Sequence, residues 1–131
     1  MVLHKIMISL FILIWTSTFS FAQSEAIDDI KIAIKSGSSK EMSKYFNTNV
    51  DVTLDEKIET FSKTQAEYVF RDFFKNNPPN SFTIVHQGSS KGGLPYAIGQ
   101  YLSDDKTYRV WMRIKKSGDS YLIHEISFIQ E

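Results

Sequence analysis

The stretch that most constrains the fold reads YAIGQYLSDDKTYRVWMRI and spans residues 96–114. The dipeptide Asp104–Asp105 separates two runs of period-two alternation, a pattern typical of a β-hairpin with a two-residue turn. Such a turn places Ser103 opposite Lys106 and Gly99 opposite Val110. The register predicts a buried hairpin face, because apolar or small side chains then share one side of the sheet. That face comprises Ala97, Gly99, Tyr101, Tyr108, Val110, Met112 and Ile114.

Period-two alternation extends on both sides of this hairpin. It predicts an antiparallel meander of four strands, over residues 81–89, 95–103, 106–116 and 120–130. The connections are short and rich in Gly, Ser and Asp, as hairpin loops are. A sheet of this kind must bury one of its faces against another layer.

Three upstream segments show the helical spacing of apolar residues that such a covering layer needs. Ser24, Ser38 and Ser62 are the predicted N-caps of these helices. Glu41 and Gln65 follow the last two caps after three residues, as in a capping box. Two short strands are predicted between the second and third helices. This order predicts an α+β fold with three N-terminal helices packed on a curved antiparallel sheet.

The last strand has two possible registers. A two-residue loop would direct inward Tyr121, Ile123, Glu125 and Ile129. A three-residue loop would direct inward Leu122, His124, Ile126 and Phe128. The second set is more uniformly apolar and is the one that we expect, and a β-bulge would mix the two.

Composition excludes several classes of function. The 131 residues include 15 Lys+Arg and 15 Asp+Glu, so a broad basic field for nucleic acid is not expected. There are no cysteines, which excludes disulfides, thiolate metal ligands and a cysteine nucleophile. Beyond the first residues the histidines are His86 and His124, without the ligand spacing of a zinc site. No metal or cofactor is therefore expected.

Residues 1–22 have the three parts of a cleavable signal peptide. Lys5 and the amino terminus form the positive end, Ile6–Trp15 is a mainly apolar run, and small residues precede the bond Ala22–Gln23. The apolar run is shorter than the ~20 residues of a membrane span. We expect cleavage, export to the periplasm or the medium, and one domain of residues 23–131 without a membrane anchor.

Five short motifs in this domain resemble a known fold family. They are SKTQAE at 62–67, RDFF at 71–74, HQG at 86–88, YAIG at 96–99 and YRVW at 108–111. With the order of elements, they are similar to the nuclear transport factor 2-like family, or cystatin-like α+β cone. More narrowly, the chain resembles a small exported bacterial family of unknown function with that fold. The resemblance implies a cone over residues 24–130 and no particular activity, since the superfamily includes isomerases, dehydratases, ligand-binding modules and protein-binding adapters.

The hairpin register also defines a face that points away from the core. Trp, Tyr and Arg are enriched at the centres of protein interfaces, and this face carries all three. The interaction candidates are Tyr96, Ile98, Arg109, Trp111 and Arg113. They would bind a second copy of the chain or an envelope protein partner. The alternative is a solvated surface on which arginine stems cover the rings.

A cone can also enclose a small apolar ligand. The candidate lining residues are Tyr45, Tyr68, His86, Tyr101, Tyr108, Met112 and His124. We therefore expect a non-enzymatic binding module that recognises a ligand in the cone or a protein on the sheet. The alternative is a cofactor-independent isomerase or dehydratase, with Asp51 or Glu125 and a tyrosine as the acid–base pair in a dry pocket. An interior filled by Phe70, Phe73, Tyr108 and Met112 would argue against that enzyme.

Overall fold

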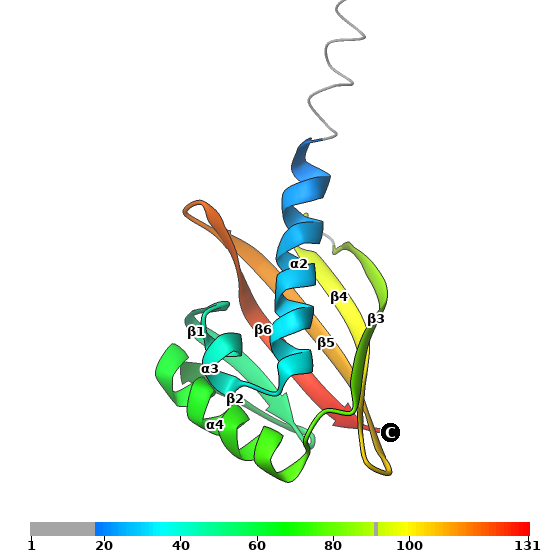
Figure 1. Ribbon diagram of the computed structural model, residues 1–131. Coiled ribbons are helices and arrows are strands. Elements are labelled where there is room, and N and C mark those ends of the chain that lie inside the picture. Colours follow the sequence, from blue (N-terminus) through cyan, green and yellow to red (C-terminus); the bar gives the residue numbers. More distant parts are fainter. Residues whose placement is uncertain (1–17, 91) are drawn as a thin grey trace, which may run out of the picture.

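The computed structural model describes residues 18–90 and 92–131 (Figure 1). It contains the helices α2 (Thr18–Ser36), α3 (Ser39–Ser43) and α4 (Lys63–Asn76). Most of the predicted leader, residues 1–17, lies outside the described part. None of the described helices is long and apolar enough to cross a membrane.

The helix ends follow largely from local chemistry. Gly37, with φ of 68°, ends α2 in the left-handed region that glycine tolerates best. Ser38 caps α3, and Ser62 with Gln65 forms the predicted capping box of α4. The predicted cap Ser24 is wrong in this structure, because α2 runs through it from Thr18.

Six strands form one sheet in the order β2-β1-β6-β5-β4-β3. Their bounds are β1 Phe46–Leu54, β2 Lys57–Ser62, β3 Ser81–Ser89, β4 Pro95–Ser103, β5 Lys106–Ser117 and β6 Ser120–Gln130. The short pair β1–β2 is thus part of the main sheet. The sheet is mixed, because β1 pairs with β6 in parallel. The predicted antiparallel pairing is confirmed for the four long strands β3 to β6. The sheet as a whole is not antiparallel, because no local hairpin dictates the direction of the β1–β6 pair.

The helices cover one side of the curved sheet (Figure 1). α2 contacts β3 and β6, whereas α4 contacts β1 and β2 and is joined to α2 through α3. The predicted order of elements is found, with α4 between β2 and β3. The description of three N-terminal helices is therefore corrected, because only α2 and α3 precede the whole sheet. The helix-facing side of the sheet is the buried side, and the opposite side is called the outer face below.

The central hairpin has the predicted register. Ser103 pairs with Lys106, and Gly99 pairs with Val110. The predicted core side chains are fully or almost fully buried, namely Ala97, Tyr101, Tyr108, Val110, Met112 and Ile114. A Cβ atom on Gly99 would lie 2.6 Å from the ring of Phe82, so the glycine makes room for that ring. Gly99 is thus required by a close approach rather than by its backbone angles.

The last strand mixes the two registers through a β-bulge. Ser117 pairs with Ser120 across a two-residue turn, and the register then shifts where Arg113 pairs with Glu125. The shift makes His124 the extra residue. The buried residues are Ile123, Ile126 and Phe128, whereas Leu122 and His124 are only half-buried. The preferred inward set was therefore wrong at Leu122 and His124, because the bulge reverses the alternation between them and Ile126.

Candidate functional site

The interior of the cone is closed by two of the predicted pocket tyrosines. Tyr101 and Tyr108 lie opposite each other on β4 and β5 and are buried. The Tyr101 hydroxyl donates to the backbone carbonyl of Asn77, and the Tyr108 hydroxyl donates to the Asn77 Oδ1 atom at 2.8 Å. Asn77 ends α4, where its own N–H donates to the carbonyl of Phe73. The tyrosines thus fasten the end of α4 to the sheet.

Burial also holds these phenols in their neutral form. It raises the pKa of Tyr101, and the neighbouring Tyr108 raises it further. Burial raises the pKa of Tyr108 as well, with a smaller contribution from Asp55. Neutral, hydrogen-bonded phenols of this kind act as structural donors at ordinary pH.

Aromatic rings fill the space beneath the tyrosines. The ring centroid of Phe73 lies 4.8 Å from that of Phe128, 5.2 Å from that of Tyr108 and 5.7 Å from that of Tyr101. Phe70 and Met112 are fully buried in the same core. The interior is therefore occupied by the residues whose presence there argues against a catalytic cavity.

The other pocket candidates do not converge. Tyr45 is half-buried and lines a hollow of about 300 Å³ between α2 and the β5–β6 turn. Tyr68 is exposed on α4, with the Arg71 guanidinium 5.0 Å from its ring centroid. His86 lies on the outer face, where its Nε2 atom is 3.0 Å from the Tyr96 hydroxyl. His124 occupies the bulge of β6.

The carboxylates considered for acid–base chemistry also lie on the outer face. Asp51 and Glu125 are neighbours on β1 and β6. Asp51 accepts a hydrogen bond from the Thr60 hydroxyl at 2.6 Å, and Glu125 lies 3.8 Å from the Arg113 guanidinium. Within residues 18–90 and 92–131, no three His, Asp or Glu side chains come together as metal ligands. Neither Asp51 nor Glu125 therefore lies in the dry interior of the cone.

The outer face gathers the predicted interaction residues. Two rows run across it, and the strand registers define their members. One row contains Tyr96, Arg113, Glu125 and Asp51, and the other contains Ile98, Trp111, Ser127 and Thr53. The Arg113 guanidinium stacks on Trp111 at 5.0 Å from the ring centroid. Its Nε atom is buried without a hydrogen-bond partner among the described residues.

The half of this face on β6, β1 and β2 was missed from the sequence. Its residues are Asp51, Thr53, Ile58, Glu125, Ser127 and Ile129. Placing them requires the parallel β1–β6 pairing, which joins strands far apart in the chain. The available signal was the alternation of Asp51 and Thr53 with buried Val50 and Val52 in β1.

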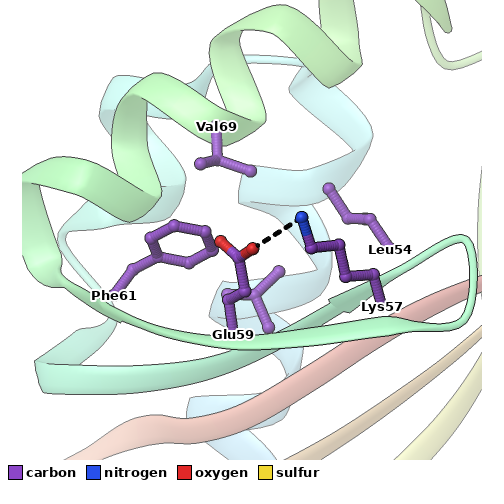
Figure 2. A pocket seen from close by; sticks show the side chains of 6 residues that line it. Leu54, Lys57, Glu59, Phe61 and Val69 are labelled. Atoms are coloured by element: carbon purple, nitrogen blue, oxygen red, sulfur yellow. Dashed lines mark ion pairs between the residues drawn. The ribbon is translucent and has the colours of Figure 1, made fainter.

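A second feature is a hollow of about 200 Å³ between α4 and β2 (Figure 2). Lys57, Glu59 and Phe61 rise from β2 towards α4, and Val69 points down from the helix. The Lys57 ammonium and the Glu59 carboxylate form an exposed ion pair at 3.0 Å. Ligand pockets usually measure about 300–1,000 Å³, so this hollow is small for a metabolite.

Comparison with solved structures places the fold among known proteins. A DUF4783 family protein from Bacteroides ovatus has 29% identity and a TM-score of 0.74, over 79% of this chain and 93% of that chain. A DUF4783 family protein from Bacteroides fragilis has 22% identity and a TM-score of 0.74, over 79% and 96%. A nuclear transport factor 2-like protein of unknown function from Shewanella baltica has 12% identity and a TM-score of 0.66, over 88% and 95%. The last similarity supports the α+β cone alone.

Two sequence comparisons complete this picture. A search of curated proteins finds no match. The family model described as "Domain of unknown function (DUF4783)" matches residues 27–128, which include α3, α4 and all of β1 to β5. The chain therefore belongs to the DUF4783 family, with a nuclear transport factor 2-like α+β fold.

Proposed function

We propose that this domain is an exported, non-enzymatic binding module whose outer sheet face binds a second copy of the chain. The leader-like pattern of residues 1–22 supports export. The closed aromatic interior supports a role for the surface rather than for a pocket. The observation that carries the proposal is that the two halves of the outer face differ in side-chain size and carry opposite charges.

One half of the face is bulky and carries two arginines, and the other has mostly smaller side chains and carries two carboxylates. The bulky half lies on β4 and β5 and consists of Tyr96, Ile98, Arg109, Trp111 and Arg113. The second half lies on β6 and β1 and consists of Glu125, Ser127, Ile129, Asp51 and Thr53, of which Ile129 is an exposed apolar residue. In a two-fold symmetric dimer the same surface of both copies forms the interface, so that surface must complement itself. Two unlike halves achieve this when the first half of each copy covers the second half of the other.

We place the two-fold axis of this proposed dimer from the strand registers. An axis parallel to the strands, between β5 and β6, places β5 of each copy over β6 of the other. Because Arg113 and Glu125 are register partners, Arg113 then meets the partner's Glu125. By the same geometry Trp111 meets the partner's Ser127. One strand further out, Tyr96 meets the partner's Asp51.

These contacts have the composition of an interface centre. Trp, Tyr and Arg dominate interaction hot spots, and a ring of polar residues commonly surrounds them. The arrangement also gives Arg113 a second carboxylate, which matters because its single pairing with Glu125 is long at 3.8 Å. Removing a guanidinium from water is costly unless carboxylates satisfy its donors, and a second carboxylate would help to offset that cost.

Trp111→Ala tests the proposal directly. The substitution removes the central ring of the bulky half, so self-association should weaken at least ten-fold, which corresponds to ~1.4 kcal/mol. Tyr68→Ala is the matched control, because Tyr68 also carries an arginine 5.0 Å from its ring but lies on α4. Sedimentation velocity and a thermal melt on both variants provide the readout. A large fall in Tm of Trp111→Ala without a change in mass would make Trp111 a core residue and would overturn the proposal.

A further inference from the structure

The two edge strands of the sheet, β3 and β2, differ in the regularity of their pairing. β3 carries a register shift at Val85 and has α2 beside it. β2 pairs with β1 without a shift from Lys57 to Ser62. A bulged or covered edge resists pairing with another strand, whereas a regular edge favours it. α4 also contacts β2, but the pairing of β2 is unbroken, so β2 is the more regular of the two edges.

The backbone of β2 presents unpaired groups along this edge. Asp55 and Glu56 both have positive φ, as in the two-residue type I′ turn of a hairpin. In such a hairpin Lys57 exchanges hydrogen bonds with Leu54, and the alternation then directs the N–H and C=O of Ile58 and Thr60 away from β1. Among the described residues β2 pairs with β1 alone, so these groups have no strand partner.

The side chains of β2 complement themselves in one register. Ile58, the second residue of β2, is 61% exposed. It lies between Lys57 and Glu59, whose side chains share the helix side of the sheet (Figure 2). The strand that would complement Lys-Ile-Glu in antiparallel pairing is itself Lys-Ile-Glu, because the first residue of one strand faces the third residue of the other.

We propose that the β2 edges of two copies pair in antiparallel fashion about Ile58. Ile58 then faces the partner's Ile58, and the outward N–H and C=O groups of the two residues bond to each other. Lys57 faces the partner's Glu59, and Glu59 faces the partner's Lys57. Opposite charges directly across an antiparallel pair are stabilising.

Neighbouring registers lack this complementarity. A pairing centred on Glu59 would place that carboxylate opposite its own copy, which is destabilising. A pairing centred on Thr60 would place Glu59 opposite the partner's Phe61 and leave both charges of the Lys57–Glu59 pair without a new partner. Charge thus selects the pairing about Ile58.

This contact uses different backbone groups from the one proposed for the outer face, although the Ile58 side chain lies on that face. The edge contact uses the backbone of β2, whereas the face contact is centred on Trp111 and Arg113. With both contacts the chain assembles beyond a dimer. Each failure can be recognised separately, because Trp111→Ala removes the face contact and leaves the β2 edge intact.

Charge reversal at the edge tests the inference. Lys57→Glu places a glutamate opposite the partner's Glu59, so edge pairing should weaken about ten-fold or more. The double variant Lys57→Glu/Glu59→Lys restores both the pair within the chain and the pairs between copies, and should associate as the unaltered chain does. Both variants are made in the Trp111→Ala background and measured by sedimentation velocity, so that only the edge contributes.

Hydrogen exchange at single amides provides the second readout. The Ile58 N–H should become protected as protein concentration rises, should lose that protection in Lys57→Glu, and should regain it in the double variant. Thermal melts confirm that each variant folds. An Ile58 amide that exchanges freely at every concentration would overturn the proposal, as would a double variant that associates no better than Lys57→Glu.

Discussion

Phe70→Ala is the sharpest test of the closed interior. Phe70 is fully buried, and its ring centroid lies 5.8 Å from that of Phe46, 6.0 Å from that of Phe74 and 5.5 Å from that of Phe128. Truncating a ring so enclosed leaves a cavity and costs ~3–5 kcal/mol. The whole folding free energy of such a domain is ~5–15 kcal/mol. At ~4 °C per kcal/mol the Tm should fall by roughly 12–20 °C.

Urea unfolding followed by circular dichroism measures this cost. Tyr68→Ala on the same helix is the control, because its exposed ring should contribute less than ~1 kcal/mol, as surface positions usually do. An unchanged m-value would show that the native and denatured states remain comparable. A loss below ~1 kcal/mol for Phe70→Ala would refute a packed interior and would reopen the cone as a ligand site.

Two further expectations concern the same core. Gly99→Ala should cost ~1–3 kcal/mol of folding free energy through overpacking, since the new methyl group would lie 2.6 Å from the Phe82 ring. Phe82→Leu in that background should recover part of the loss in a urea titration. No recovery would show that the strain lies elsewhere. Burial and Tyr108 hold the pKa of Tyr101 above its ordinary value, so the unfolded chain releases that proton first as pH rises. The stability contributed by the neutral phenol is then full below about pH 10 and falls progressively as the pH rises from there towards the folded-state pKa. Urea midpoints from pH 8 to 11.5 should fall less steeply for Tyr101→Phe than for the unaltered chain, and equal slopes would contradict the assignment.

The sequence predicted the elements that depend on local signals, namely hairpin turns and helix caps. The Asp104–Asp105 turn determined the whole β4–β5 register, because side-chain alternation admits no slip once one face is buried. The capping box at Ser62 and Gln65 located the start of α4 in the same way. The outer-face candidates on these two strands therefore lie together as predicted.

Features that depend on distant contacts could not be predicted in this way. The parallel pairing of β1 with β6 joins segments separated by most of the domain, and it brings Asp51 beside Glu125. The bulge at His124 allows a two-residue turn and the burial of Ile126 and Phe128 to occur in the same strand. A prediction from strict period-two alternation contains no such extra residue. Asn77 accepts hydrogen bonds from the hydroxyls of Tyr101 and Tyr108. From the sequence it was recognisable only as a residue at the end of a helix.

A charge swap measured by sedimentation equilibrium tests most directly whether the outer face complements itself across a two-fold axis. Arg113→Glu and Glu125→Arg each place like charges across the proposed interface, and the double variant restores every pair. We expect the unaltered chain and the double variant to have the mass of an assembly at concentrations where either single variant dissociates. A double variant as dissociated as the single ones, or single variants with unchanged mass, would contradict the account.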